Sequence, residues 1–196
     1  MEGKLFLLDA YALIFRSYYA FIKNPRINTR GVNTSAIFGF TNTLIDIIKK
    51  ENPTHIAVVF DPPGGSFRNT LYSAYKANRD ETPEVIRMSV PIIKDVIRAF
   101  RIPVIEIEGF EADDTIGTLA KKLANPYFQV FMMTPDKDYT QLVDENIRIY
   151  KPGRAGNESE ILDIAKVNAQ FEITHPDQVR DILALWGDSS DNIPGA

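Results

Sequence analysis

Acidic side chains gather in three short stretches of the chain. The stretches read GFEADDTIG at 109–117, MTPDKDYTQL at 133–142 and WGDSSDNIPG at 186–195. With two acids nearer the N-terminus they supply nine candidates for one site: Asp9, Asp61, Glu111, Asp113, Asp114, Asp136, Asp138, Asp188 and Asp191. Like charges at this density repel, so they either take up protons or bind cations. Donor sets made only of oxygen suit hard cations such as Mg²⁺, Mn²⁺ or Ca²⁺.

Several of these acids follow short apolar runs that are typical of buried strands. Asp9 follows LFLL, Asp61 follows IAVVF, Glu111 follows VIEIEGF, and the pair at 136 and 138 follows VFMMTP. The carboxyl ends of parallel strands lie along one edge of a sheet, where such sheets bind ligands. We therefore expect acids from four distant parts of the chain to converge. The alternative is that some of them only cap helices or complement helix dipoles. Taken alone, Asp9 suits this alternative better than a functional role, and Asp113 and Asp114 suit both equally.

Other metal or catalytic arrangements fit the sequence poorly. The chain has no Cys, which excludes disulfides and Cys-ligated zinc. His55 lies at the far end of its strand from Asp61, roughly 20 Å away at about 3.3 Å per residue, and His175 precedes a Pro. We expect both to be structural. The segment 136–147 begins like a calcium loop but lacks the required Gly and closing Glu.

A basic and aromatic stretch, SFRNTLYSAYKANR at 66–79, follows the second predicted strand. If this stretch is helical, Arg68, Tyr72, Lys76 and Arg79 share one face, bordered by Tyr75. Cations interleaved with aromatics suit a phosphate backbone and stacked bases, although a solvated helical face is the alternative. The chain has 22 basic and 26 acidic residues, a net charge of −4. Without the nine clustered acids the balance becomes +5, so the overall acidity does not exclude a nucleic-acid partner.

Strands and helices alternate along the 196 residues. We predict strands at 4–9, 55–61, 103–109, 128–134 and 146–152, and helices at 10–22, 34–52, 82–100 and 112–125, with two short helices within 161–187. This alternation predicts an α/β fold with a mostly parallel central sheet flanked by helices. Thr82 is the expected N-cap of its helix, Pro91 should kink or split that helix, and 152–160 is a polar loop. No apolar run reaches the ~20 residues of a membrane span, and with no Cys we expect a cytoplasmic location.

Four motifs then occur in register: VVFDPPGGSFRNTLYSAYKANR, GFEADDTIGTLA, TPDKDYTQLV and GDSSDNIPG. In this order they resemble the 5′ nuclease domain of bacterial DNA polymerase I, of the flap endonuclease superfamily. The resemblance runs from residue 4 to residue 195. It implies a PIN-like fold with a helical arch at about 75–91. It also implies a catalytic domain at 1–175 and, at 176–196, the truncated start of a helix-three-turn-helix that grips duplex DNA.

The resemblance further implies two-metal hydrolysis of phosphodiester bonds by two Mg²⁺ or Mn²⁺ ions. It assigns Asp9, Asp61, Glu111 and Asp113 to a first ion, and Asp136, Asp138, Asp188 and Asp191 to a second, with Asp114 between them. It assigns contacts with the scissile phosphate to Lys76 and Arg79, and further substrate contacts to Arg16, Arg68 and Tyr72. The implied partner is DNA with a 5′ flap or an RNA primer, bound by a monomer, during replication and repair. A polymerase domain would belong to the same parent chain.

Two rival readings stay open at this point. A phosphatase or a Toprim-like enzyme also places acids at strand ends, but a phosphatase usually carries D-x-D on its first strand. Here Asp9 is followed by Ala10 and Tyr11. The other rival is a catalytically inactive DNA-binding module.

Overall fold

A six-stranded sheet runs through the centre of the computed structural model, which describes residues 3–153 and 158–196. The strand order is β3-β2-β1-β4-β5-β6, and only β6 runs antiparallel to its neighbour. The strands are β1 (Gly3–Asp9), β2 (His55–Phe60), β3 (Val104–Glu106), β4 (Phe128–Met133), β5 (Ile147–Lys151) and β6 (Glu160–Leu162). The predicted α/β class with a mostly parallel sheet is confirmed.

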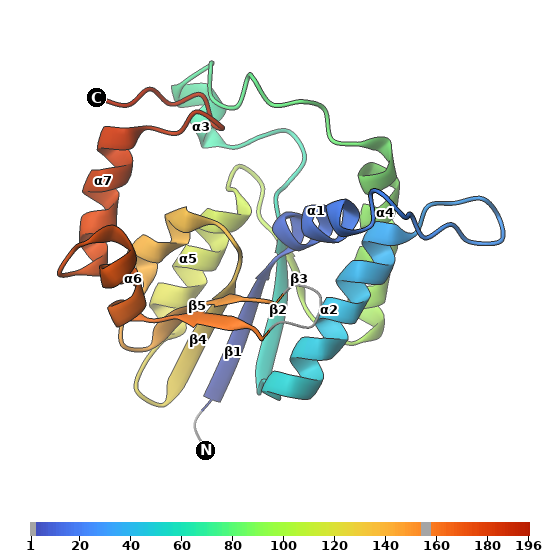
Figure 1. The fold of residues 1–196 in the computed structure, drawn as a ribbon, viewed down its shortest axis with the longest axis horizontal. Coiled ribbons are helices and arrows are strands. Elements are labelled where there is room, and N and C mark those ends of the chain that lie inside the picture. The colour runs from blue at the N-terminus through green and yellow to red at the C-terminus, as the bar shows by residue number, and fades with distance from the viewer. Residues whose placement is uncertain (1–2, 154–157) are drawn as a thin grey trace.

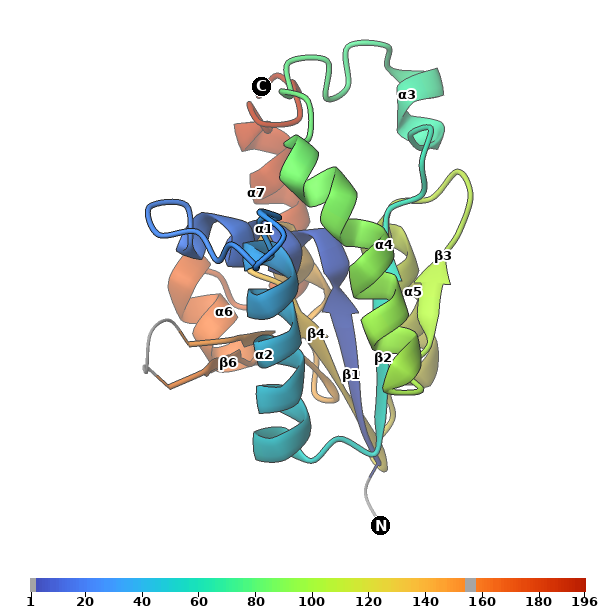
Figure 2. The same ribbon diagram turned by 90° about the vertical axis from the view of Figure 1, so that its right-hand side faces the viewer.

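Helices cover both faces of this sheet (Figures 1 and 2). One face packs against α1 (Ala10–Ala20), α2 (Ser35–Glu51) and α4 (Glu84–Ala99); the other packs against α5 (Ala112–Leu123), the 3-10 helix η1 (Lys137–Leu142), α6 (Ile164–Phe171) and α7 (Val179–Trp186). The short α3 (Phe67–Leu71) and η2 (Pro176–Gln178) complete the set. Among the described residues no helix is both long and apolar enough to cross a membrane.

The central strands are apolar on both sides because each side meets a helical layer. In β1, Phe6 and Leu8 belong to the core under α1, α2 and α4, whereas Leu5 and Leu7 belong to the core under α5. Phe6 stacks on Phe131 of β4 with ring centroids 4.9 Å apart. Burial on both faces explains why the strand reads as a continuous apolar run and not as an alternation.

Two expectations at the edges of the fold are wrong. The sixth strand, β6, has three residues and was expected within a polar loop and the helix after it; residues 154–157 of that loop lie outside the described residues. The strand expected at 103–109 covers only Val104–Glu106. Pro91 lies on the exposed side of α4 and does not split the helix; the kink expected as the other outcome stays a prediction.

The basic and aromatic stretch does not form the single helix that its spacing would allow. A capping box between Ser66 and Asn69 starts α3, which ends at Leu71. The chain continues through turns, with Lys76 at a φ of 56°, until α4 begins after Pro83, which takes the N-cap place expected for Thr82. We call residues 72–83 the α3–α4 connection. Figure 1 shows it crossing beyond the carboxyl ends of the strands, so the predicted arch is helical only from residue 84 onward.

The last described segment returns to this same end of the molecule. After α7 the chain turns at Gly187, which has a φ of 68° and where an added Cβ would lie 2.3 Å from the backbone nitrogen of Gly195. Only Gly fits that position. Residues 188–193 then form a tight turn closed by the backbone bridge between Asp188 and Ile193. In Figure 1 this turn lies beside α3 and the start of the α3–α4 connection.

Candidate functional site

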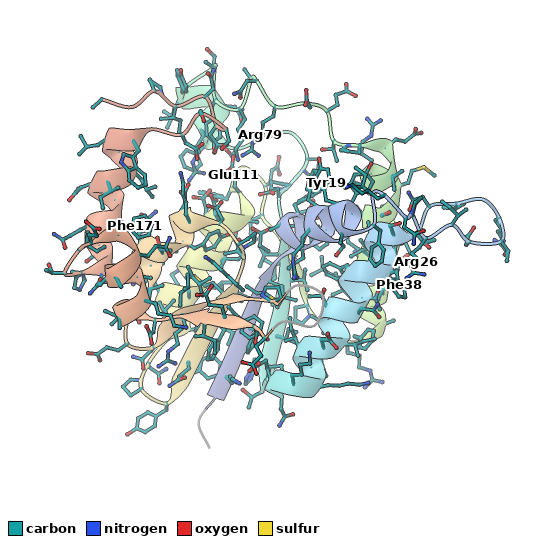
Figure 3. The ribbon with its side chains drawn as sticks, in the orientation of Figure 1. Tyr19, Arg26, Phe38, Arg79, Glu111 and Phe171 are labelled. Carbon is teal, nitrogen blue, oxygen red and sulfur yellow. The ribbon has the colours of Figure 1, made fainter. Side chains whose placement is uncertain are left out.

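Five acids converge on one open pocket at the carboxyl edge of the sheet, as the strand-end pattern predicts. The pocket has a volume of about 200 Å³, and we call it the acid pocket. Its charged and hydroxyl-bearing lining residues are Asp9, Asp61, Glu111, Asp113, Asp136, Lys76, Arg79, Tyr11 and Tyr139. Figure 3 shows Arg79 and Glu111 together above the strand ends. The convergence of acids from four strand ends is therefore confirmed.

Short backbone interactions fix the acids at the strand ends. Asp9 ends β1 and caps α1, because its Oδ1 accepts a hydrogen bond of 3.1 Å from the Ala12 amide. Asp61 follows β2 and accepts 2.7 Å from the amide of Ala112, the first residue of α5. Glu111 is the N-cap of that helix. Two helix N-termini, whose dipoles favour negative charge, thus begin at the acid pocket.

Glu111 is held by a cation and two hydroxyls. Lys76 Nζ lies 2.6 Å from its Oε2, Ser66 Oγ donates at 2.8 Å, and the Tyr75 hydroxyl donates at 3.1 Å. Burial by itself raises the pKa of Glu111, but the hydrogen bonds from Lys76 and Ser66 outweigh it, so the pKa lies below its ordinary value. The Glu111 carboxylate is therefore charged, and both of its oxygens accept hydrogen bonds.

Asp9 and Asp113 have the opposite electrostatic character. Burial, reinforced by the charges of Asp61 and Asp136, raises the pKa of Asp9 from 3.8 to about 7. Burial and the neighbouring Asp114 raise the pKa of Asp113 to about 6. The charge of Arg68 lowers the pKa of Asp113 but does not outweigh these effects, and no cation is among the main influences on Asp9. A bound cation would relieve both.

The turn at 188–193 is tied to the α3–α4 connection. Arg79 forms an ion pair with Asp191, and Lys76 Nζ lies 3.9 Å from the same carboxylate. The Lys76 amide also donates to the backbone oxygen of Asp191 at 3.0 Å. Asp188 accepts a hydrogen bond of 2.8 Å from the Ser190 amide inside its own turn. Burial raises the pKa of Asp188, but the hydrogen bonds from Ser190 outweigh burial, so the pKa lies below its ordinary value.

A second pocket of about 440 Å³ lies on the other side of Asp113. It contains Asp114, which Arg68 binds through two bonds of 2.7 and 2.8 Å, and Asp138. Burial, followed by the charges of Asp136 and Asp188, raises the pKa of Asp138 to about 6. Asp136 lines the acid pocket, whereas its neighbour Asp138 lines the second pocket.

The remaining predicted contact residues lie at the rim or outside it. Tyr72 donates from its hydroxyl to the backbone oxygen of Asn192 at 3.2 Å. Arg16 on α1 donates to the backbone oxygens of Pro152 (2.9 Å) and Gly153, and it does not line the acid pocket. The structure therefore places Tyr72 against the turn at 188–193 and Arg16 against residues 152 and 153, and neither lines either of the two pockets. The two histidines lie away from both pockets, as expected.

Three polar residues that were not predicted from the sequence complete the site. Ser66 donates to Glu111, Thr134 donates to Asp9 at 3.3 Å, and Tyr139 lies in the wall of both pockets. Ser66 begins a short helix and Thr134 directly follows β4, so their positions near strand ends carried a usable signal. Nothing in the sequence distinguishes the hydroxyl of Tyr139 from that of any core tyrosine.

Within residues 3–153 and 158–196, no three acidic or imidazole side chains stand together as a ready metal-ligand set. Ion pairs account for part of this, because Lys76 and Arg79 occupy oxygens of Glu111 and Asp191. The donor set still fits a hard cation, since it consists of oxygen atoms. Two buried polar atoms, Oδ1 of Asp138 and the hydroxyl of Tyr139, also have no hydrogen-bond partner among the described residues.

The fold and the pocket define an α/β protein with a crowded carboxylate site at the carboxyl ends of its strands, overlaid by a cationic connection. Comparison with known proteins narrows this class. Residues 4–172 match the family described as "5′-3′ exonuclease, N-terminal resolvase-like domain", and the chain belongs to this family.

Relatives and a solved structure agree with that assignment. The chain is 40% identical to DNA polymerase I of Treponema pallidum (strain Nichols), over 97% of this chain and 19% of the relative. It is 37% identical to a 5′-3′ exonuclease of Aquifex aeolicus (strain VF5), over 97% of this chain and 64% of that protein. The fold matches the bacteriophage T5 D15 flap endonuclease, solved with DNA and metal ions, with a TM-score of 0.74 and 20% identity, over 98% of this chain and 69% of that one. The chain thus spans less than two thirds of the length of these two curated relatives.

Proposed function

We propose that this chain is a metal-dependent 5′ nuclease that hydrolyses phosphodiester bonds in DNA bearing a 5′ flap or an RNA primer. The observation that carries the proposal is the acid pocket, in which five carboxylates from four strand ends face two cations on the α3–α4 connection. Membership of the 5′-3′ exonuclease family supports it, as do the names of the relatives. The structural neighbour, a flap endonuclease solved with DNA and metal ions, supports the same class of reaction.

The nine acids divide between two ions in this proposal. Asp9, Asp61, Glu111 and Asp113 hold the first, Asp136, Asp138, Asp188 and Asp191 hold the second, and Asp114 lies between them. The ions are Mg²⁺ or Mn²⁺, because oxygen donors suit hard cations. When bound, they supply Lewis-acid chemistry, which lowers the pKa of an attacking water and offsets charge on the leaving oxygen. The raised pKa values of Asp9 and Asp113 support this assignment, since burial and neighbouring carboxylates outweigh any cation near them.

Lys76 and Arg79 neutralise the scissile phosphate. Each now binds a carboxylate of the site, Lys76 that of Glu111 and Arg79 that of Asp191. If Glu111 and Asp191 held metal ions, Lys76 and Arg79 would be able to turn toward the phosphate, whose charge grows in the transition state. In the free protein the two side chains neutralise carboxylates of the site instead.

Further residues contact the substrate away from the cleaved bond. Tyr72, on the connection, stacks on a base or supports the displaced strand. Arg68 and Arg16 lie where a phosphate backbone approaches from either side of the pocket. Because both already bind protein oxygens, we expect them to position the strand and not to react.

We also propose a domain organisation, an oligomeric state and a cellular role. Residues 1–175 form the catalytic domain and 176–196 begin a DNA-binding helix-three-turn-helix. The chain acts as a monomer in the removal of primers and flaps during replication and repair, and hence in the cytoplasm. Most of the similar relatives named as DNA polymerase I are about five times longer than the matched region, which supports a polymerase domain in the same parent chain.

A 5′-flap assay with Mg²⁺ or EDTA tests the proposal and separates it from its rivals. We expect Mg²⁺-dependent cleavage that leaves 5′-phosphate ends. A phosphatase would instead release inorganic phosphate from a 5′-phosphorylated strand without cutting it. An inactive binding module would shift the flap in a gel and leave it intact with either Mg²⁺ or Mn²⁺. Either result would overturn the nuclease proposal.

A further inference from the structure

Tyr139 is a buried tyrosine whose hydroxyl has no hydrogen-bond partner in the part of the chain that the structure describes. The residue lies in η1, directly after Asp138, and is 2% exposed. It belongs to the same core cluster as Ala112 and Ile116 of α5. Buried hydroxyls normally find a partner, because an unpaired one loses its bond to water without replacement. This exception therefore points to a partner that the free protein does not supply.

The tyrosine is placed at the junction of the two acidic pockets. It lines the acid pocket beside Asp9, Asp113 and Asp136, and it also lines the second pocket beside Asp138. Every charged neighbour named here is a hydrogen-bond acceptor when ionised. The hydroxyl is thus a donor surrounded by acceptors that it does not reach in the free protein.

The neighbouring carboxylates are held by other groups or repelled by one another. Asp9 accepts from the Ala12 amide at 3.1 Å and from the Thr134 hydroxyl at 3.3 Å. Asp113 accepts from the Asp114 amide at 2.6 Å. A cation drawing these carboxylates together would change where their remaining lone pairs point, and each carboxylate has about four such acceptor positions.

The chemistry of a tyrosine hydroxyl suits the role of a donor. The group carries one proton and can donate a single hydrogen bond. An ionised carboxylate only accepts hydrogen bonds, so the two groups are complementary.

We propose that Tyr139 is a positioning residue of the ion site, whose hydroxyl donates a hydrogen bond to a carboxylate of the acid pocket, Asp9 foremost, once that carboxylate holds a cation. The inference rests on the proposed function only in requiring that divalent ions bind at this pocket. Groups that hydrogen-bond to metal ligands orient them, and losing one costs roughly 10–100-fold in metal affinity. The free protein carries the unpaired hydroxyl as a cost that ion binding removes.

Titration calorimetry with Mn²⁺ on the full chain tests this. Tyr139→Phe removes one oxygen atom and keeps the ring. We expect about tenfold weaker Mn²⁺ affinity, together with a melting temperature in EDTA that is equal to or above that of the parental protein. Tyr150→Phe is the matched control, since Tyr150 is a core tyrosine, 3% exposed, on the opposite face of the sheet and outside both pockets. The control should leave Mn²⁺ affinity unchanged.

The outcomes separate the inference from the proposed function. If the parental protein binds no Mn²⁺, the ion site itself is wrong and both ideas fall. If the parental protein and Tyr139→Phe bind Mn²⁺ equally, only the role of Tyr139 is overturned. Tyr139→Met gives a second side chain without a hydroxyl and must show the same loss. If Met weakens binding and Phe does not, the ring and not the hydroxyl is responsible, and the inference fails.

Discussion

Asp9 combines two roles whose demands conflict. As the last residue of β1 and the N-cap of α1 it stabilises the local backbone. As a buried acid facing Asp61 and Asp136 it is costly to ionise, and its pKa rises to about 7. The folded protein consequently binds this proton more tightly than the unfolded chain does. The contribution of Asp9 to stability is complete below about pH 4 and is lost as the pH rises toward 7.

Asp9→Asn should therefore stabilise the ion-free protein at neutral pH, because it removes the charge and keeps an oxygen for the cap. We expect the melting temperature in EDTA to rise by roughly 2–6 °C at pH 7.5, for a gain of about 1–2 kcal/mol. The gain should shrink toward zero near pH 4, where the carboxyl is already neutral. Thermal melts across that pH range, with Asp95→Asn on the exposed surface of α4 as the control, provide the measurement. A destabilised Asp9→Asn at pH 7.5 would contradict the raised pKa.

Lys76 matters for a different reason, since its charge is already paired in the free protein. We expect Lys76→Ala to slow single-turnover cleavage of a 5′-flap by roughly 100-fold, with a much smaller change in flap affinity, because the charge is needed most in the transition state. Arg98→Ala removes a cation from the exposed part of α4, where Arg98 forms an ion pair with Asp95, and this variant should cleave at the parental rate. If both variants lose the same rate, Lys76 acts only through the net charge of the protein and not through its position at the pocket.

At the scale of elements, a helix or strand can be predicted from the sequence where enough residues repeat a hydrophobic pattern. β1, β2 and β4 are continuous apolar runs buried on both faces, and α2 and α5 carry apolar stripes, so their positions follow from the sequence. β6 has three residues and pairs only at the edge of the sheet, which leaves too few positions for a pattern. The 66–79 stretch has helical spacing, yet Lys76 adopts a positive φ. Tertiary contacts with the turn at 188–193 override its local preference.

Those contacts make the α3–α4 connection and the turn at 188–193 one structural unit. The Asn192 side chain donates to the Ala74 oxygen at 2.9 Å, and Asn78 donates to the Ser189 oxygen at 2.8 Å. Asn192 also has a φ of 60°, a conformation in which Asn is far better tolerated than Ala. The position of Lys76 over the pocket thus depends on residues more than a hundred positions later in the chain.

Asn192→Ala should loosen both segments, because it removes the bond to Ala74 and adds backbone strain. We expect faster hydrogen exchange at the Lys76 amide, which donates to the Asp191 oxygen, and unchanged exchange in β1 and β4. Asn192→Gly separates the two causes, since Gly accepts the positive φ and also lacks the side chain. Exchange at Lys76 that stays at the parental rate in the Ala variant would mean that the ion pair of Arg79 with Asp191 holds the unit without Asn192.

At the scale of the whole molecule, folding brings acidic side chains together at one place, where they repel one another. Nine of the 26 acidic residues belong to the acid pocket, the second pocket and the turn at 188–193. The convergence of acids could be predicted from the sequence, because parallel strands end at one edge. The pairing of Lys76 with Glu111 and the closure of the site by the C-terminal turn could not, because both depend on how a loop without periodicity folds over that edge.

This concentration predicts that divalent ions stabilise the whole fold. Ions that bind the folded protein alone add about 2.7 kcal/mol at one hundred times their dissociation constant, enough to raise the melting temperature of a chain this size by roughly 5–10 °C. Calorimetric melts in EDTA and in Mn²⁺ measure the gain, and K⁺ at matched ionic strength controls for screening of surface charges. Asp136→Asn removes one charge from the acid pocket and should keep only part of the gain. Asp46→Asn, on the exposed face of α2, should keep all of it. Identical melting curves of the parental protein in EDTA and Mn²⁺ would mean that the carboxylates relieve their repulsion through Lys76, Arg68 and Arg79 alone, and the assignment of an ion site would then be wrong.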